Sequence, residues 1–345
     1  MKRFMIGKVT IGDDAPPLVI PEIGINHGGS LQVACTMIDA AAKAGARLIK
    51  HQTHVVEDEM SDEARKVIPG NSKESIYDVM AHCALSEAEE RELMRYTESL
   101  GLEFISTPFS RAAADRLERF GVKAFKIGSG EMNNYPLLDH VASFGKPMIV
   151  STGMNSLEDV EKAVNLLERK GVPYALLHCT NLYPTKPEQV RLGAMCQMME
   201  RFPEVPIGLS DHTLNNNACI AAIALGAAVV ERHFTDSMAR EGNDIPCSMD
   251  PSNLRALLTA AAEVPAMLGG TKAALPEEQV TIDFAFATVV TIADIRAGEL
   301  FSEKNLWVKR PGTGEIRAEE YPSLLGRRAT CDIPNGTHLT RAMIG

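Results

Sequence analysis

The sequence lacks the features of a membrane-spanning or disulfide-stabilised protein. Its longest apolar run without a charge, residues 218–230, is shorter than the roughly 18 residues of a membrane-spanning helix. The seven cysteines are scattered and form no CxxC pair, so neither a disulfide framework nor a zinc cluster is predicted. Lys8 interrupts the apolar residues at the beginning of the chain before they reach the length of a signal peptide. We therefore expect a cytoplasmic protein without a membrane partner.

Positive charge is scarce as well. The chain has 35 lysines and arginines against 45 aspartates and glutamates, a formal net charge of -10. Nucleic-acid binding depends on clustered Lys and Arg, so no nucleic-acid partner is expected, and any anionic ligand needs a local positive pocket. What the chain has is length and apolar content: 345 residues, 45% of them hydrophobic, suit a large domain followed by a small one.

Short apolar runs alternate with amphipathic helical stretches between residues 17 and 270. Four of the helical stretches cover residues 30–44, 86–100, 156–170 and 251–268. Eight strand and helix units of this spacing favour an α/β fold, a closed parallel (β/α)8 TIM barrel, over a doubly wound sheet, which is the alternative. The predicted strands are residues 18–24, 47–52, 102–107, 124–128, 147–151, 174–179, 205–210 and 227–232.

Two further segments flank this barrel. Residues 3–12 are typical of a short hairpin, which could plug the lower mouth of the barrel. We expect a hairpin and catalytic barrel over residues 1–270, a polar linker over 271–283 and a small, loop-rich domain over 284–345. The small domain has too few residues for a generous core, so contact with a barrel is expected to help stabilise it.

Barrel enzymes carry their active sites at the carboxyl ends of the strands, and polar residues stand at nearly all of these ends. Lys50 and Lys126 come from different strands into one barrel mouth, where buried lysines are costly unless they meet an anion. Together with three serines at other strand ends, the lysines predict a pocket for a phosphate and a carboxylate. These serines are Ser129, Ser151 and Ser210.

Carboxyl groups at the same barrel mouth have two interpretations. Glu22 and Glu131 could simply pair with the two lysines, which is the structural alternative to an anion pocket. Alternatively Glu22, Glu131 and Asp244 could act as general acids or bases, because a dry pocket raises the pKa of a carboxyl group toward neutrality.

Two histidines predict a metal site. His212 and His233 end neighbouring strands, and two neutral imidazoles plus water oxygens suit a divalent transition ion such as manganese. Core histidines bound to Asp211 or Glu231 would give the same sequence, so this alternative stays open. Three more histidines lie near other strand ends and remain candidates by spacing: His27, His51 and His54.

Several segments at these strand ends are long and unusual enough to carry a resemblance. They are residues 21–27 (PEIGINH), 50–60 (KHQTHVVEDEM), 126–131 (KIGSGE), 151–155 (STGMN), 208–213 (GLSDHT) and 231–235 (ERHFT), followed by 283–287 (DFAFA) and 307–312 (WVKRPG). The sequence resembles the bacterial sialic acid synthases, which condense phosphoenolpyruvate with an N-acetylated mannosamine. This family implies a TIM barrel followed by an antifreeze-like (SAF) domain, in a domain-swapped homodimer whose small domain covers the partner's active site.

The resemblance also implies a role for individual residues. It puts His212 and His233 on the metal and Glu131 near the reacting centre. The phosphoenolpyruvate side would have its carboxylate on Lys50 and Thr107, and its phosphate among Lys126, Ser129, Ser151, Asn181 and Ser210. The acceptor-sugar side would be Glu22, Gln52, Tyr183, Asp244, Phe284 and Arg310, with Arg310 contacting the sugar's N-acetyl group from the other subunit.

The implied activity is that of an N-acetylneuraminate synthase. Phosphoenolpyruvate, N-acetylmannosamine and water would give N-acetylneuraminic acid and phosphate, with Mn²⁺ as the divalent ion and Mg²⁺ or Co²⁺ as alternatives. The nearest rival is a legionaminic or pseudaminic acid synthase that uses a 2,4-diacetamido-trideoxyhexose. A lysine Schiff-base pyruvate aldolase is a second rival, and a non-catalytic carbohydrate-binding protein is the alternative outside enzymes.

Overall fold

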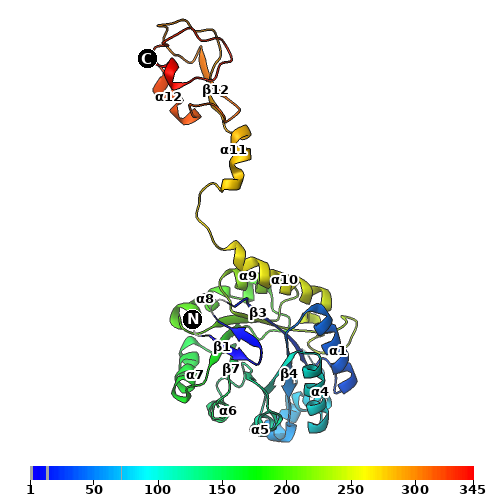
Figure 1. Ribbon diagram of the computed structural model, residues 1–345. Coiled ribbons are helices and arrows are strands. Elements are labelled where there is room, and N and C mark those ends of the chain that lie inside the picture. Colours follow the sequence, from blue (N-terminus) through cyan, green and yellow to red (C-terminus); the bar gives the residue numbers. More distant parts are fainter. Residues whose placement is uncertain (1–2, 13–14, 71) are drawn as a thin grey trace. The chain divides into compact units, whose positions relative to one another are not determined.

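Eight parallel strands form a closed barrel in the computed structural model, which describes residues 3–12, 15–70 and 72–345 (Figure 1). Strand β10 closes the ring by pairing with β3, with His233 opposite Glu22. The predicted (β/α)8 barrel is therefore confirmed, and the doubly wound alternative is wrong. The strands are β3 (Leu18–Gly24), β4 (Leu48–Thr53), β5 (Glu103–Pro108), β6 (Phe125–Ile127), β7 (Met148–Ser151), β8 (Tyr174–Cys179), β9 (Ile207–Asp211) and β10 (Val229–His233).

Helices surround the barrel (Figure 1). The predicted strands and helices differ from the observed ones by no more than two residues at either end. Between β4 and α4 the chain adds α2 (Val56–Glu59), the 3₁₀ helix η1 (Asp62–Lys66) and α3 (Ile76–Cys83), none of which was predicted. The outer helices are α1 (Leu31–Ala44), α4 (Glu87–Ser99), α5 (Arg111–Phe120), α6 (Tyr135–Ala142), α7 (Leu157–Lys170), α8 (Leu192–Arg201), α9 (Asn217–Ala224) and α10 (Pro251–Met267), with short 3₁₀ turns η2 (Pro187–Gln189) and η3 (Ile245–Cys247).

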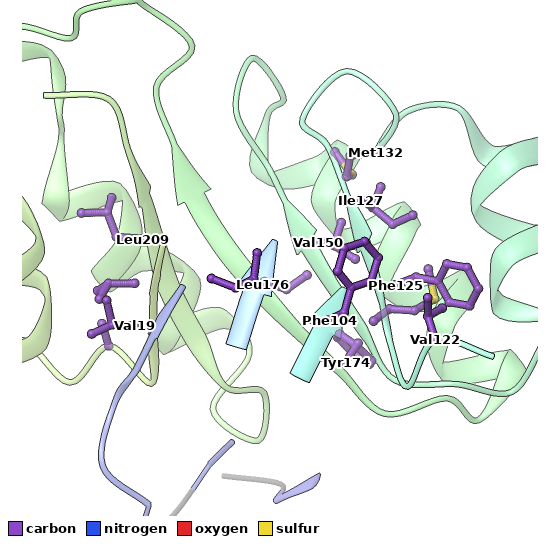
Figure 2. Close-up of a cluster of buried hydrophobic side chains, with 14 of the residues drawn as sticks. Val19, Phe104, Val122, Phe125, Ile127, Met132, Val150, Tyr174, Leu176 and Leu209 are labelled. Carbon is purple, nitrogen blue, oxygen red and sulfur yellow. The ribbon is translucent and has the colours of Figure 1, made fainter. Parts of the chain in front are cut away.

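Successive side chains along each strand point alternately out of and into the barrel, and this produces two apolar layers. Side chains such as Val19, Phe104 and Leu176 point outward and belong to the large core between strands and helices (Figure 2). Their inward neighbours, including Leu18 and Ile105, form a second cluster inside the barrel. The hairpin of β1 (Phe4–Ile6) and β2 (Val9–Ile11) adds its apolar side chains to that inner cluster, at the amino ends of the strands. The expected plug of the lower mouth is thus confirmed, and only the carboxyl ends remain for a site.

The chain divides into two compact units, Met1–Gly269 and Gly270–Gly345. The second unit has its own small core around Val289, Phe301 and Leu306. The segment expected as a polar linker contains η4 (Pro276–Glu278) and most of α11 (Gln279–Ala285). The other elements of this unit are the antiparallel pair β11 (Thr288–Thr291) and β12 (Leu306–Lys309), η5 (Ala318–Glu320), α12 (Tyr321–Leu324) and η6 (Arg341–Met343). Within the described ranges, no helix has the length and apolarity required to cross a membrane.

Candidate active site

A cavity of about 330 Å³ lies at the carboxyl ends of the barrel strands. The strand residues that line it point into the barrel, like those of the apolar inner cluster, but lie closer to the carboxyl ends of the strands. Glu22, for example, lies two residues after Ile20, and Lys50 two residues after Leu48. His27, His51 and His54, which were candidates by spacing alone, are not among its lining residues. Every barrel residue to which the resemblance gave a role does line the cavity: Glu22, Lys50, Gln52, Thr107, Lys126, Ser129, Glu131, Ser151, Asn181, Tyr183, Ser210, His212, His233 and Asp244. Their chemical roles stay predictions.

The two lysines share buried carboxylates. Lys50 Nζ contacts Glu22 Oε1 and lies 3.2 Å from Glu231 Oε1, while Lys126 Nζ lies 3.8 Å from that same Glu231 oxygen. Lys126 also donates hydrogen bonds to Ser151 Oγ (2.6 Å) and to a backbone carbonyl (2.8 Å). The pairing of Lys50 with Glu22 matches the structural alternative, but the second carboxylate beside the lysines is Glu231, not Glu131.

The two carboxylates stabilise the positive charge of Lys50 more than that of Lys126. Burial opposes ionisation of Lys50, but Glu22 and Glu231 outweigh it and raise the pKa of Lys50 above its ordinary value. Burial lowers the pKa of Lys126, and the attraction of Glu231 offsets only part of that effect. The ammonium of Lys126 is therefore the member of the group that an added anion would stabilise most.

Glu231 is the functional candidate that sequence reasoning missed. From the sequence it had no role beyond that of a possible partner of the histidines. The sequence did contain a signal. Glu231 stands two residues before His233, and residues two positions apart in a strand lie on the same face of the sheet. The same rule places His51, between Lys50 and Gln52, on the outward face of β4, where its Nδ1 lies 3.4 Å from Glu90.

Buried polar atoms without a hydrogen-bond partner are concentrated at the cavity. Among the described residues they include Thr107 Oγ1, Asn181 Oδ1 and Glu231 Oε2. Close by, a Cβ on Gly153 would overlap Asn181 Oδ1 and approach Ser129 Oγ to 2.8 Å, so only glycine allows these groups to converge. Because unpaired buried polar groups are costly, this concentration indicates a polar ligand.

His212 and His233 face one another with ring centroids 5.4 Å apart. His212 Nδ1 lies 3.0 Å from the carbonyl of Thr180, a hydrogen bond that leaves Nε2 available as a ligand atom. Burial lowers the pKa of His212 to about 3, which keeps the imidazole neutral as metal binding requires. The partner of His212 is thus a carbonyl, so its proposed pairing with Asp211 or Glu231 is wrong.

The pair can supply two nitrogen ligands to a divalent ion. His233 Nδ1 is buried without a hydrogen-bond partner and lies 3.8 Å from both Glu22 Oε2 and Asp244 Oδ2. No group of three or more His, Cys, Asp and Glu side chains with metal-binding geometry occurs in the described part of the chain. An ion held by the two imidazoles alone would take its remaining ligands from water or substrate.

The last two predicted residues belong to the second unit. Phe284 lies in α11 and is 59% exposed, and Arg310 follows β12 and is exposed as well. The peptide bond between Arg310 and Pro311 is cis. Both side chains are accessible on the surface of their own unit.

A model described as the NeuB family matches residues 37–273, and one described as the SAF domain matches residues 286–345. The chain belongs to the NeuB family. It is thus an enzyme of the sialic-acid-synthase type, which forms carbon–carbon bonds, and the aldolase and non-catalytic alternatives fall away. Enzymes of this family depend on a metal ion, which agrees with the two-imidazole site.

Relatives in the NeuB family differ in the acid that they make. The N,N'-diacetyllegionaminic acid synthase of Campylobacter jejuni is 37% identical, covering 91% of this chain and 96% of its own length. The human N-acetylneuraminate-9-phosphate synthase is 33% identical over 92% of this chain and 90% of its own. A crystal structure of the N-acetylneuraminic acid synthetase of Leptospira borgpetersenii has a TM-score of 0.74 at 30% identity, covering 81% of this chain and 95% of that one.

Proposed function

We propose that the protein condenses phosphoenolpyruvate with N-acetylmannosamine and water to give N-acetylneuraminic acid and phosphate. The observation that carries the proposal is the incompletely neutralised Lys126 ammonium, held by Ser151 at 2.6 Å among polar atoms without partners. Phosphoenolpyruvate brings a phosphate and a carboxylate, and the cavity offers one lysine for each. Lys126 would bind the phosphate with Ser129, Ser151, Asn181 and Ser210, and Lys50 would bind the carboxylate with Thr107.

The acceptor aldehyde would lie at the histidine end of the cavity. A divalent ion on His212 and His233, Mn²⁺ or else Mg²⁺ or Co²⁺, would act as a Lewis acid that polarises the aldehyde. Glu22 reaches this end of the cavity, 3.8 Å from His233, and Lys50 holds the pKa of Glu22 well below its usual range against the effect of burial. Glu22 is therefore an ionised carboxylate that can accept hydrogen bonds from sugar hydroxyls and guide their protons.

The bond changes then follow from the chemistry of the enol phosphate. C3 of phosphoenolpyruvate attacks the aldehyde carbon, and a new carbon–carbon bond forms while positive charge develops at C2. Water adds to C2, and the carbon–oxygen bond to phosphate breaks to leave a 2-keto acid. Glu131 is the candidate base for that water, because burial raises the pKa of Glu131 to about 7.

We propose that the working unit is a domain-swapped homodimer. Phe284 and Arg310 are exposed on their own unit, and an arginine is well suited to donate hydrogen bonds to the carbonyl of an N-acetyl group. Arg310 would reach the acceptor in the partner's barrel. The protein would act in the cytoplasm, where its seven unpaired cysteines stay reduced.

A 2,4-diacetamido-trideoxyhexose is the second candidate acceptor. It is favoured by the 37% identity to the legionaminic acid synthase and by an apolar part of the cavity wall. Ile25, Ile76, Val79 and Met80 line this part, where the methyl group of a trideoxy sugar would be buried more favourably than a hydroxyl.

Phosphate release from phosphoenolpyruvate tests both acceptors. The purified protein with Mn²⁺ is given no sugar, N-acetylmannosamine or the diacetamido sugar, and products are identified by mass. Sugar-dependent release with a product of N-acetylneuraminic acid mass is expected. Lys126→Met should abolish release, whereas Lys162→Met, at an exposed lysine, should not change it. Release only with the diacetamido sugar would transfer the assignment to that acceptor, and release with neither would overturn the proposal.

A further inference from the structure

Arg232 and Asp211 directly precede the two histidines of the candidate metal site, one on each of two neighbouring strands. They form the last pair of residues in the ladder between β10 and β9, so His233 and His212 come next on their respective strands. Side chains alternate along a strand, and accordingly the histidines line the cavity whereas the arginine and the aspartate do not. Both of these charged side chains are nevertheless buried, with 1% and 2% of their surface exposed.

Asp211 and Arg232 together hold the residue that follows His212. Asp211 Oδ1 accepts a hydrogen bond from the backbone amide of Thr213 at 3.1 Å, and its Oδ2 accepts one from Thr213 Oγ1 at 2.8 Å. From the neighbouring strand, Arg232 Nη2 donates to the carbonyl of Thr213 at 2.5 Å, and Nη1 donates to Asn216 Oδ1 at 2.7 Å. The backbone is therefore fixed on both sides of His212, by the strand before it and by these side chains after it.

Arg232 also reaches the segment that supports His233. Its Nη2 donates to the carbonyl of Cys247 at 3.4 Å, and two residues later the amide of Met249 donates to the carbonyl of His233 at 2.7 Å. The Nε of Arg232 lies 3.2 Å from Asp211 Oδ2 but makes no hydrogen bond, so the aspartate compensates the charge while the other two nitrogens bind the backbone and Asn216. One guanidinium thus joins the two segments that hold the two histidines.

We propose that Arg232 is a positioning residue that sets the relative placement of His212 and His233 for a divalent ion. Two imidazoles bind one ion only if their lone pairs are directed at one point, and a pair that is already held in place loses less conformational entropy on binding. His233 depends on its backbone for this, because its Nδ1 has no hydrogen-bond partner. Loss of a residue that orients metal ligands typically weakens metal binding by roughly 10- to 100-fold. The consequence for condensation rests on the function proposed above, whereas the effect on metal binding does not.

Arg232→Lys tests the hydrogen bonds separately from the charge. The ammonium of a lysine keeps a positive charge beside Asp211, but it lacks the planar fork that binds Thr213, Asn216 and Cys247 together. We expect the full-length, metal-free variant to bind Mn²⁺ about tenfold or more weakly than wild type. Electron paramagnetic resonance of the free ion measures this dissociation constant without any substrate, and His212→Ala, which removes a ligand, shows whether the ion binds at the histidine pair.

A matched control carries the same substitution at another buried carboxylate. Arg116 Nη1 lies 3.1 Å from Glu90 Oε2, whose side chain is 1% exposed, and neither residue lines the cavity. Arg116→Lys should lower the free energy of unfolding, as Arg232→Lys does, but leave the dissociation constant for Mn²⁺ unchanged. Asn216→Ala removes a single acceptor of Arg232 and should weaken Mn²⁺ binding by a smaller factor, so the inference stays testable if Arg232→Lys does not fold.

Three results would overturn the inference. Arg232→Lys and Asn216→Ala could both bind Mn²⁺ as wild type does, or Arg116→Lys could weaken binding as much as Arg232→Lys, and either result would leave Arg232 a stabilising residue only. The wild-type protein could also bind no Mn²⁺, or bind it no better than His212→Ala does. Phosphate release from phosphoenolpyruvate would still decide the proposed function in each case, because the metal-binding experiment uses neither phosphoenolpyruvate nor a sugar.

Discussion

Glu131 is the residue whose ionisation should control the rate near neutral pH. Burial raises its pKa to about 7, with Glu59 adding to the effect, so the carboxylate needed as a base is lost as the pH falls below 7. We expect kcat/KM, which reports the free enzyme, to rise with pH through about 7. Glu131→Gln should lower kcat by roughly 10² to 10⁴ and abolish this limb. A limb that persists in the variant would assign the titration to another group.

The same pKa makes a prediction for stability. Between pH 4.5, the ordinary value for this group, and pH 7, the folded protein holds a proton on Glu131 that the unfolded chain has released. The stabilisation is full below pH 4.5 and is lost as the pH rises to 7, by about 3 kcal/mol from this group. Relative to wild type, Glu131→Gln should therefore gain in free energy of unfolding across this range. Urea denaturation of both proteins at several pH values measures the difference, and a constant offset would refute it.

Glu231 compensates two buried lysines, so its removal should cost stability that an anion can restore. Glu231→Gln leaves Lys126 without its carboxylate and weakens the pairing of Lys50. An uncompensated buried charge costs about 3 kcal/mol or more. We expect that loss in denaturant unfolding, with a larger gain on adding inorganic phosphate than in wild type.

A control for this substitution lies on the surface. Glu161→Gln removes one partner of the exposed ion pair with Arg201 and should change the free energy of unfolding by less than about 1 kcal/mol. If Glu231→Gln behaved like this control and phosphate stabilised it no more than wild type, the lysines would not depend on Glu231.

At the scale of residues, the sequence predicted most of the side chains that line the cavity but not which of them form ion pairs with one another. Strand-end position identified Lys50, Lys126 and the histidines, because all parallel strands end at the same mouth. As the alternative to an anion pocket it paired the lysines with Glu22 and Glu131, and only the Glu22 pairing occurs, since proximity in space between β6 and β10 residues is not a local property of the sequence. Applying the two-residue alternation to each strand would have added Glu231 and separated His51, which faces Glu90, from the site.

At the scale of elements, capping residues gave the helices their boundaries. Helix α7 begins with a capping box, in which Ser156 accepts from the Asp159 amide and Asp159 binds back, and it ends at Gly171 with φ 67°. Ser156→Ala should lower the free energy of unfolding by about 1 kcal/mol and leave kcat unchanged, because Ser156 bonds within its own helix and does not line the cavity. A change in kcat with no change in stability would be the opposite of this expectation. Chemical denaturation and phosphate-release assays measure the two quantities.

Elements too short for a repeating hydrophobic pattern could not be predicted from the sequence. Helices α2 and η1 have too few residues for an amphipathic pattern, and α3, with eight residues, is scarcely longer. Yet α3 supplies the apolar part of the cavity wall through Ile76, Val79 and Met80. The polar composition of residues 271–283 likewise indicated a linker, although η4 and most of α11 form there. The apolar part of the cavity wall was therefore less predictable than the lysine end, because it is built largely from the short helix α3.

At the scale of the whole molecule, the proposed domain swap predicts complementation between two inactive chains. A Lys126→Met chain has a defective barrel but an intact Arg310, and an Arg310→Ala chain has the reverse. In a swapped mixed dimer, one site combines the intact barrel with the intact arginine, and the other combines both defects. Random pairing makes half of the dimers mixed, so co-expression should recover about a quarter of wild-type activity.

The control and the contrary outcome follow from the same geometry. Lys50→Met and Lys126→Met both damage the barrel, so a mixture of these two chains has no intact site in any pairing and should stay inactive. If Arg310 served the barrel of its own chain, the first mixture would give only the mean of its two parents. Recovery in the first mixture and none in the second would therefore require that Arg310 acts on the partner's cavity, because no pairing within one chain joins an intact Lys126 to an intact Arg310.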